Sequence, residues 1–198
     1  LFFFKGKENA PFAICNAGGG FAFVGAMHDS FPHAFELSKM DYNAFVLIYR
    51  PNAKLACLDL ARAISFVFEN AKDLGVNVSD YSLWGGSAGA RMAALLGPYG
   101  TSAFGEKSLP RPRAVIMQYT GHTDYTANEP PTYACVGEND WIANWRTMQK
   151  RLENISAFGV PTEFHKYAGL GHGFGLGIGM VAEGWINDAV AFWQRQSR

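Results

Sequence analysis

The sequence has no excess of charge of either sign. Its 198 residues hold 17 Lys and Arg and 17 Asp and Glu, so the formal net charge at pH 7 is zero with neutral histidines. Nucleic acids and anionic membranes attract proteins through a basic field, so this balance argues against both as partners. We expect the partner to be a small or neutral molecule, and the oligomeric state stays open.

Long apolar runs are also missing. Hydrophobic residues make up 48% of the chain and charged residues 17%, which excludes a disordered composition, yet no apolar run approaches the length of a membrane span. The length suits one domain with a substantial core and is too short for two of ordinary size. We therefore expect residues 1–198 to form a single domain.

Cysteine is scarce and dispersed. Cys15, Cys57 and Cys135 are an odd set within apolar sequence, so we expect core residues rather than a disulfide framework or a metal site. This slightly favours a reducing, cytoplasmic compartment, although the start at Leu1 without an initiator methionine leaves localisation open. Zinc-like His and Cys spacing, GxGxxG and a Walker lysine are all absent from the sequence, so neither a metal nor a cofactor is implied.

Strand-like apolar segments alternate with helical segments along the whole chain. This pattern predicts an α/β fold of three layers, with a mostly parallel sheet covered on both faces. The expected strands are 1–4, 12–15, 44–49, 81–84, 114–118, 132–136 and 163–167. The expected helices are about 30–40, 54–74 capped by Gly75, 90–96, 142–158 followed by Gly159, and 180 to the C-terminus, while the Gly- and Pro-rich 97–112 predicts a loop or short lid.

The segment 85–89 reads Gly-Gly-Ser-Ala-Gly and lies between the strand 81–84 and the helical run 90–96. A strand that turns into a helix at one residue forces that residue into a strained backbone, and flanking glycines remove side chains that would clash there. The hydroxyl of Ser87 is therefore expected to project from the turn at a helix N-terminus, where backbone N–H groups favour negative charge. Ser87 is the candidate nucleophile.

A serine nucleophile needs a base, and the base needs a carboxylate that orients it. Asp140 follows the strand 132–136, and His172 lies in a glycine-rich loop after the strand 163–167. Loops at the carboxyl ends of parallel strands meet at one edge of the sheet, so Ser87, Asp140 and His172 can converge there. Asp124, which follows the preceding strand, is the alternative carboxylate.

Donors for an oxyanion are expected from two places. Gly18, Gly19 and Gly20 follow the strand 12–15, and successive glycines let bare backbone N–H groups approach a ligand. The N–H of Ala88, next to the nucleophile, would supply a matching donor.

These motifs resemble the α/β-hydrolase fold and, within it, small serine esterases of the acetyl esterase, hormone-sensitive-lipase-like and carbohydrate esterase type. The resemblance covers nearly the whole chain: 18–20 stands for the HGGG-type loop, 49–50 for the Tyr-Arg pair after the next strand, 85–89 for the nucleophile elbow, 137–140 for the acid turn and 171–174 for the histidine loop. It implies Ser87 as nucleophile, His172 as general base and acid, Asp140 as its orienting carboxylate, and Gly19, Gly20 and Ala88 as oxyanion donors. Two departures stand out. Ala17 stands where many members of the resembled family have histidine, and we expect the family's first strand to be either missing or unseen upstream of Leu1.

We expect hydrolysis of short-chain carboxylic esters, such as acetyl esters of carbohydrates, through an acyl-enzyme on Ser87. Few residues separate Asp124 from the strand 132–136, so there is no room for a large cap, and the cleft should be open with Phe21, Trp141 and Phe174 as substrate-binding residues. The alternatives are a serine peptidase or amidase of the same fold and a non-catalytic binding protein.

The remaining histidines are expected to play structural roles. This applies to His28 and His33, which flank a helix start and are read as solvated or packing residues, and to His165, read as half-buried in a strand. His122 near the site edge contacts substrate or packs in its loop.

Overall fold

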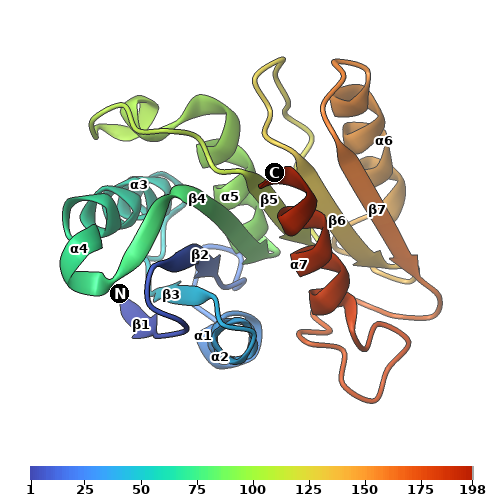
Figure 1. Cartoon of the computed structure of the whole chain (residues 1–198). Coiled ribbons are helices and arrows are strands. Elements are labelled where there is room, and N and C mark those ends of the chain that lie inside the picture. The colour runs from blue at the N-terminus through green and yellow to red at the C-terminus, as the bar shows by residue number, and fades with distance from the viewer. Residues whose placement is uncertain (198) are drawn as a thin grey trace.

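The computed structural model describes residues 1–197, and within them seven strands form one sheet in the order β1-β3-β2-β4-β5-β6-β7 (Figure 1). The strands are β1 (Phe2–Phe4), β2 (Ala10–Asn16), β3 (Asn43–Leu47), β4 (Val76–Gly86), β5 (Ala114–Gln118), β6 (Thr132–Gly137) and β7 (Thr162–Tyr167). Only β1 is antiparallel to its neighbour; the other neighbouring pairs are parallel. The predicted mostly parallel sheet is confirmed, and β4 begins earlier than its apolar end suggested.

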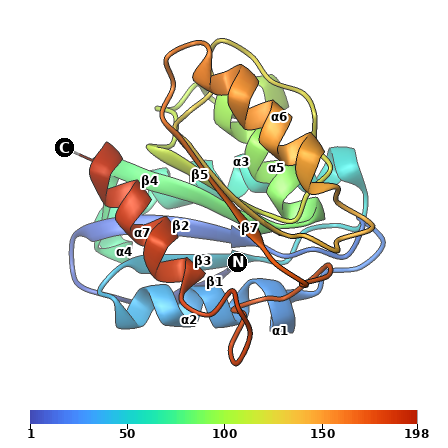
Figure 2. The same ribbon diagram turned by 90° about the vertical axis from the view of Figure 1, so that its right-hand side faces the viewer.

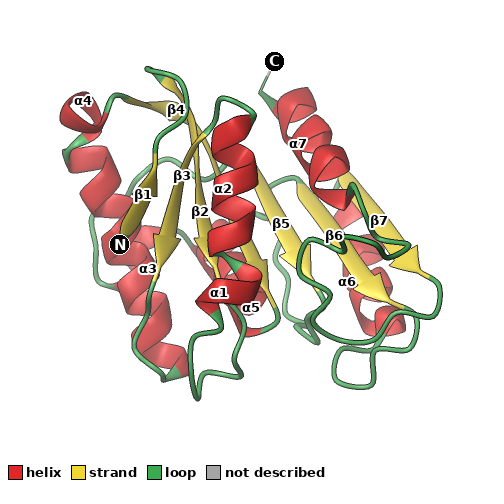
Figure 3. Cartoon of the chain, turned by 90° about the horizontal axis from the view of Figure 1, so that it is seen from below, coloured by secondary structure: helices red, strands yellow, loops and turns green. Residues whose placement is uncertain are grey.

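Helices cover both faces of the sheet, so the predicted three-layer arrangement is confirmed. Helices α1 (Ala26–Asp29), α2 (Phe31–Lys39) and α7 (Trp185–Gln196) lie on one face, and α3 (Ala53–Glu69), α5 (Ala88–Tyr99) and α6 (Trp145–Ser156) lie on the other (Figures 2 and 3). The short α4 (Ala71–Leu74) and the 3₁₀ turn η1 (Thr101–Phe104) complete the described helices. None of these helices is both long and apolar enough to span a bilayer.

The core lies between the sheet and its two helical layers. Residues of β3, β5 and β6 are buried on both faces of the sheet, which explains why these strands read as continuous apolar runs rather than alternating ones. The largest buried side chains are Trp84 of β4 and Trp185 and Trp193 of α7. The three cysteines are free and buried, as predicted from their apolar surroundings.

Several helix boundaries differ from the sequence expectation, each for a local reason. The helix predicted over 54–74 stops at Glu69, and α4 follows after Asn70, which ends α3 by donating from its side chain to the Phe66 carbonyl. Gly75 does take the predicted left-handed cap, with φ of 65°. The helix expected from residue 142 starts at Trp145 because Asn144 caps it, accepting from the N–H of Arg146.

The last helix and the 97–112 segment also begin and end differently. Helix α7 starts at Trp185 instead of residue 180, after Gly184 with φ of 89°. Helix α5 continues to Tyr99, and η1 takes up the next residues, so only the rest of 97–112 is a loop.

The carboxyl ends of β2 to β7 point to one edge of the sheet, where their loops gather (Figure 3). The glycine loop follows β2, the elbow follows β4, the acid turn follows β6 and the histidine loop follows β7. The topology therefore brings all four sequence motifs to the same edge.

Candidate active site

Ser87 occupies the sharp turn between β4 and α5. Its φ of 51° and ψ of −113° lie in a sparsely populated region that costs about 1–3 kcal/mol for a residue with a side chain. The glycines on either side are sterically required, since a Cβ on Gly85 would lie 2.2 Å from Gly89 and a Cβ on Gly89 would lie 2.0 Å from the Asn16 carbonyl oxygen. The Ser87 N–H donates to the Gln118 carbonyl at 3.0 Å, which ties the turn to β5.

Ser87, His172 and Asp140 form one hydrogen-bonded chain. The Ser87 Oγ lies 3.0 Å from His172 Nε2, and His172 Nδ1 lies 2.7 Å from Asp140 Oδ2. In this arrangement Nδ1 donates to the carboxylate, so Nε2 is left to accept the serine proton. The alternative acid, Asp124, is exposed and accepts instead from the hydroxyl of Tyr99, so the structure brings Asp140 rather than Asp124 to the histidine.

Both oxygens of the Asp140 carboxylate accept hydrogen bonds, one from backbone N–H groups and the other from His172. The side chain of Asp140 is fully buried, and Oδ1 accepts from the N–H groups of Ile142 and Ala143 at 2.9 and 2.7 Å. These two bonds leave Oδ2 facing the imidazole. The turn that delays the start of α6 is therefore the same turn that aims the carboxylate.

The glycine loop after β2 presents backbone donors to the site. The Gly18 carbonyl accepts from Gly25 N–H, and the Gly19 carbonyl accepts from Ala22 and Phe23 N–H. In a planar trans peptide the N–H points away from the C=O, so the N–H groups of Gly19 and Gly20 point away from these internal bonds. Both glycines have positive φ, 127° and 61°, and both line the pocket at Ser87.

Ala88 is the first residue of α5, where an N–H has no partner within the helix. Among the described residues, no acceptor is assigned to the N–H of Ala88, Gly19 or Gly20. The three expected donors therefore remain available at the edge that carries Ser87.

The loop is anchored although Ala17 stands where the resemblance leads one to expect histidine. The buried Tyr49 hydroxyl donates to the Ala17 carbonyl at 2.8 Å, and the N–H of Gly18 donates to Asp29 Oδ2 at 2.9 Å. Both bonds hold the same peptide unit, one at its oxygen and one at its nitrogen. The Tyr49–Arg50 pair thus contributes through the tyrosine, while Arg50 pairs with Asp59 on the surface.

A pocket of about 420 Å³ opens at Ser87. It is lined by residues of the glycine loop, of α1 and of the loops that follow β4 to β7: Gly18, Gly19, Gly20, Phe23, Gly25, His28, Asp29, Ser87, Tyr119, Ile142, His172 and Gly173. The large apolar or aromatic side chains in its lining are Phe23, Tyr119 and Ile142.

The expected substrate-binding residues Phe21, Trp141 and Phe174 are not among the residues that line this pocket. Phe21 packs toward the Tyr49 ring behind the loop, with centroids 6.2 Å apart. Trp141 is 87% exposed, and Phe174 is buried edge-on against Tyr119. Each of the three directly adjoins a lining residue in the sequence, namely Gly20, Ile142 and Gly173. Neighbouring residues of a loop point their side chains in different directions, so one can face the pocket while the next does not.

His28 is exposed, as its reading as a solvated or packing residue predicts. It also lines the pocket, and its Nε2 donates to the Gly173 carbonyl at 2.6 Å, which links α1 to the histidine loop. Tyr119 could have been found from the sequence because it directly follows β5 at the same sheet edge. Asp29 carried no comparable local signal.

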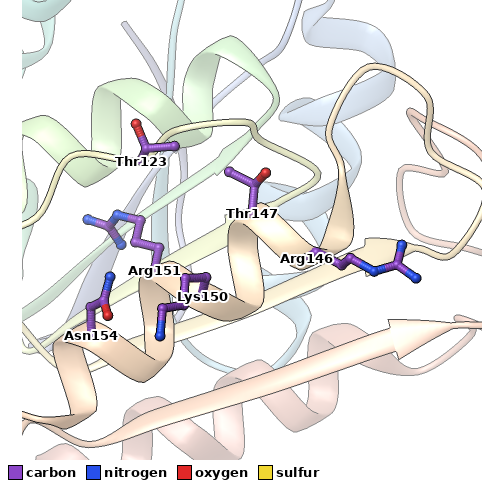
Figure 4. Close-up of a pocket in the computed structure, with 6 residues that line it drawn as sticks. All are labelled: Thr123, Arg146, Thr147, Lys150, Arg151 and Asn154. Carbon is purple, nitrogen blue, oxygen red and sulfur yellow. The ribbon is translucent and has the colours of Figure 1, made fainter.

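A separate cavity of about 360 Å³ lies along α6, lined by Thr123, Arg146, Thr147, Lys150, Arg151 and Asn154 (Figure 4). It shares no lining residue with the pocket at Ser87, and its buried Arg151 is already paired with Glu129 at 3.0 Å. Over residues 1–197 no cluster of three or more His, Cys, Asp or Glu side chains is arranged to hold a metal ion.

The BD-FAE family model matches residues 4–127, which is more than half of the chain. No protein with a curated description matches the sequence.

Solved structures share the fold. An acetyl ester-xyloside bifunctional hydrolase from Caldicellulosiruptor lactoaceticus superimposes with a TM-score of 0.85 at 22% identity, covering 95% of this chain and 84% of its own. A sugar hydrolase from Lactococcus lactis gives 0.82 at 20% identity, covering 98% and 92%. The propionate-bound esterase Est2 from Thermogutta terrifontis gives 0.83 at 18% identity, covering 98% and 88%. At these identities the likeness establishes the α/β-hydrolase fold.

Proposed function

Since the chain belongs to the BD-FAE family, we propose that it is a serine hydrolase that cleaves short-chain carboxylic esters through an acyl-enzyme on Ser87. The observation that carries the proposal is the continuous relay from Ser87 Oγ to His172 Nε2 at 3.0 Å and from His172 Nδ1 to Asp140 Oδ2 at 2.7 Å. A relay of this kind, facing backbone donors, is the arrangement that acyl transfer requires.

In the acylation step, Ser87 Oγ attacks the ester carbonyl carbon while His172 Nε2 takes the hydroxyl proton. The carbonyl oxygen becomes an oxyanion, which accepts hydrogen bonds from the N–H groups of Ala88, Gly19 and Gly20. The imidazolium of His172 is stabilised by the buried carboxylate of Asp140 and gives its proton to the leaving alcohol. The carbon–oxygen bond to the alcohol breaks, and the acyl group stays on Ser87.

Deacylation repeats these roles with water as the nucleophile. His172 takes a proton from water, the hydroxide attacks the acyl carbon, and the Ser87 oxygen leaves with the proton returned by His172. The products are a carboxylic acid and the free serine, so the site is ready for another ester.

The pocket favours a short acyl group. Its volume of about 420 Å³ must hold both the acyl group and part of the alcohol, and Phe23, Tyr119 and Ile142 are the large apolar or aromatic side chains that line it. Two relatives point the same way, since one is described as an acetyl ester-xyloside hydrolase and another holds propionate. Acetyl esters of carbohydrates are therefore the substrates to test first.

The test is a series of p-nitrophenyl esters of increasing acyl length, assayed with the wild type and with Ser87→Ala. We expect the highest kcat/KM for acetyl to butyryl esters and a loss of nearly all activity in Ser87→Ala. The matched control is Ser102→Ala, an exposed serine on η1 outside the pocket, which should keep wild-type activity.

Three results would contradict the proposal. Full activity in Ser87→Ala would remove the serine mechanism, and faster cleavage of an aminoacyl amide than of an aryl acetate would indicate a peptidase. A folded protein that an organophosphonate does not label at Ser87 would indicate a binding protein that keeps the fold.

A further inference from the structure

One carboxylate beside the relay has no part in the mechanism above. Asp29 ends α1, is only 8% exposed and lines the pocket that contains Ser87. Buried carboxylates are rare unless they are paired, and among the described residues no cation forms an ion pair with Asp29. Its two oxygens instead accept from two uncharged donors, one on each side of the site.

The first donor belongs to the oxyanion loop. Gly18 N–H donates to Asp29 Oδ2 at 2.9 Å, and the carbonyl of the same peptide unit accepts from Tyr49. The carboxylate is wedged between this loop and the elbow, because a Cβ on Gly18 would lie 2.6 Å from Oδ2 and a Cβ on Gly86 would lie 2.8 Å from it. Asp29 therefore fixes the loop at the residue before the donors Gly19 and Gly20.

The second donor is Tyr119, whose hydroxyl donates to Asp29 Oδ1 at 2.6 Å. The ring of Tyr119 is fully buried and packs edge-on against the imidazole of His172, with centroids 4.9 Å apart. Burial and the nearby Asp29 charge both raise the pKa of Tyr119 well above its usual value, so the hydroxyl stays protonated and keeps donating.

We propose that Asp29 is a positioning residue that sets the oxyanion loop and, through Tyr119, the ring of His172 in one register around Ser87. This inference rests on the function proposed above. The negative charge of a carboxylate would by itself destabilise a developing oxyanion nearby. The benefit of Asp29 therefore comes from holding the oxyanion loop and Tyr119 in place. Because preorganised donors carry much of the stabilisation of an acyl-transfer transition state, a small displacement of the loop is costly.

The decisive variants are Asp29→Asn and Tyr119→Phe, assayed on p-nitrophenyl acetate. An asparagine has one acceptor oxygen, so only one of the two donors keeps its acceptor. We expect kcat to fall about 10- to 100-fold in Asp29→Asn and about 3- to 10-fold in Tyr119→Phe, with KM within about 3-fold of wild type. The double variant should lose less than the product of the two single losses, because both substitutions alter the hydrogen bond between Tyr119 and Asp29.

Matched controls separate positioning from a general loss of stability. Tyr133→Phe removes another buried tyrosine hydroxyl, and Asp80→Asn alters another carboxylate that accepts an N–H, from Trp193; neither residue lines the pocket. Both should keep kcat within about 2-fold, with the folded fraction of every variant measured by circular dichroism at the assay temperature.

The proposal is overturned if folded Asp29→Asn keeps the wild-type kcat, or if the two losses multiply in the double variant. If Asp29→Asn does not fold, Tyr119→Phe decides, and an unchanged kcat in that variant overturns the proposal. These outcomes require an active wild type, so a wild type that neither hydrolyses aryl acetate nor reacts with an organophosphonate would refute the proposed function instead.

Discussion

Replacing Asp140 with asparagine tests how the relay works. Oδ1 of Asp140 accepts from the N–H groups of Ile142 and Ala143, and Oδ2 accepts from His172 Nδ1. The single oxygen of the introduced side-chain amide would stay with the two backbone donors, because the opposite orientation would set the amide N–H₂ against both of them. The N–H₂ group would then face His172.

This orientation reverses the histidine. Nδ1 would have to accept from the amide, so the imidazole proton would move to Nε2, which would donate to Ser87 Oγ and no longer accept its proton. The imidazolium formed during reaction would also lack a carboxylate. We expect kcat to fall by about 10³- to 10⁴-fold, or about 4–5.5 kcal/mol in the activation free energy, with KM little changed.

The assay is steady-state hydrolysis of p-nitrophenyl acetate, with thermal unfolding measured alongside to verify that Asp140→Asn is folded. Asp124→Asn is the matched control, because Asp124 is exposed, accepts only from Tyr99 through its side chain, and should leave kcat within about 2-fold. A folded Asp140→Asn variant within tenfold of the wild type would refute the reasoning. A large loss in Asp124→Asn would do so as well.

Two further predictions concern stability. Gly89→Ala should lower the free energy of unfolding, measured by urea titration, by at least about 2 kcal/mol, because the new Cβ would lie 2.0 Å from the Asn16 carbonyl oxygen. The control Gly171→Ala, whose Cβ would meet nothing within 4 Å, should leave this free energy unchanged. Equal urea midpoints for the two variants would contradict the prediction. Burial lowers the pKa of His33 and of His122 to about 4. Histidines in the unfolded chain have a pKa of about 6.5, so between about pH 4 and 6.5 the unfolded chain binds more protons than the folded protein. The contribution of these two histidines to stability should therefore be complete above this window, and the free energy of unfolding should fall by roughly 2 kcal/mol per histidine at about pH 5. Unchanged urea midpoints between about pH 7 and 5 would contradict it.

Much of the fold follows from short-range patterns. A buried parallel strand needs a run of apolar residues, and a helix that covers it needs one apolar face, so the alternation along the chain predicts the sheet and its two layers. The elbow is equally local: only glycines at 85 and 89 allow a serine in a left-handed turn between β4 and α5. Helix ends were less predictable, because side chains such as Asn70 and Asn144 competed for the backbone donors and acceptors there.

The composition of the pocket wall was beyond these patterns. Phe21, Trp141 and Phe174 stand in the correct loops, but a loop turns its side chains by dihedral angles that no periodicity encodes, and Phe23, Tyr119 and Ile142 line the pocket instead. The loops could be assigned to the site, whereas the side chains that face it could not.

The sequence alone determined that an alcohol, an imidazole and an acid follow strands that end at the same edge, since chain order and glycine spacing are local properties. The tertiary structure decided which acid meets the imidazole and how the glycine loop is held, through contacts such as that between Asp29 and Tyr119, which are 90 residues apart. Contacts of this kind depend on how whole elements pack, to within about an ångström, and local backbone preferences do not carry that information.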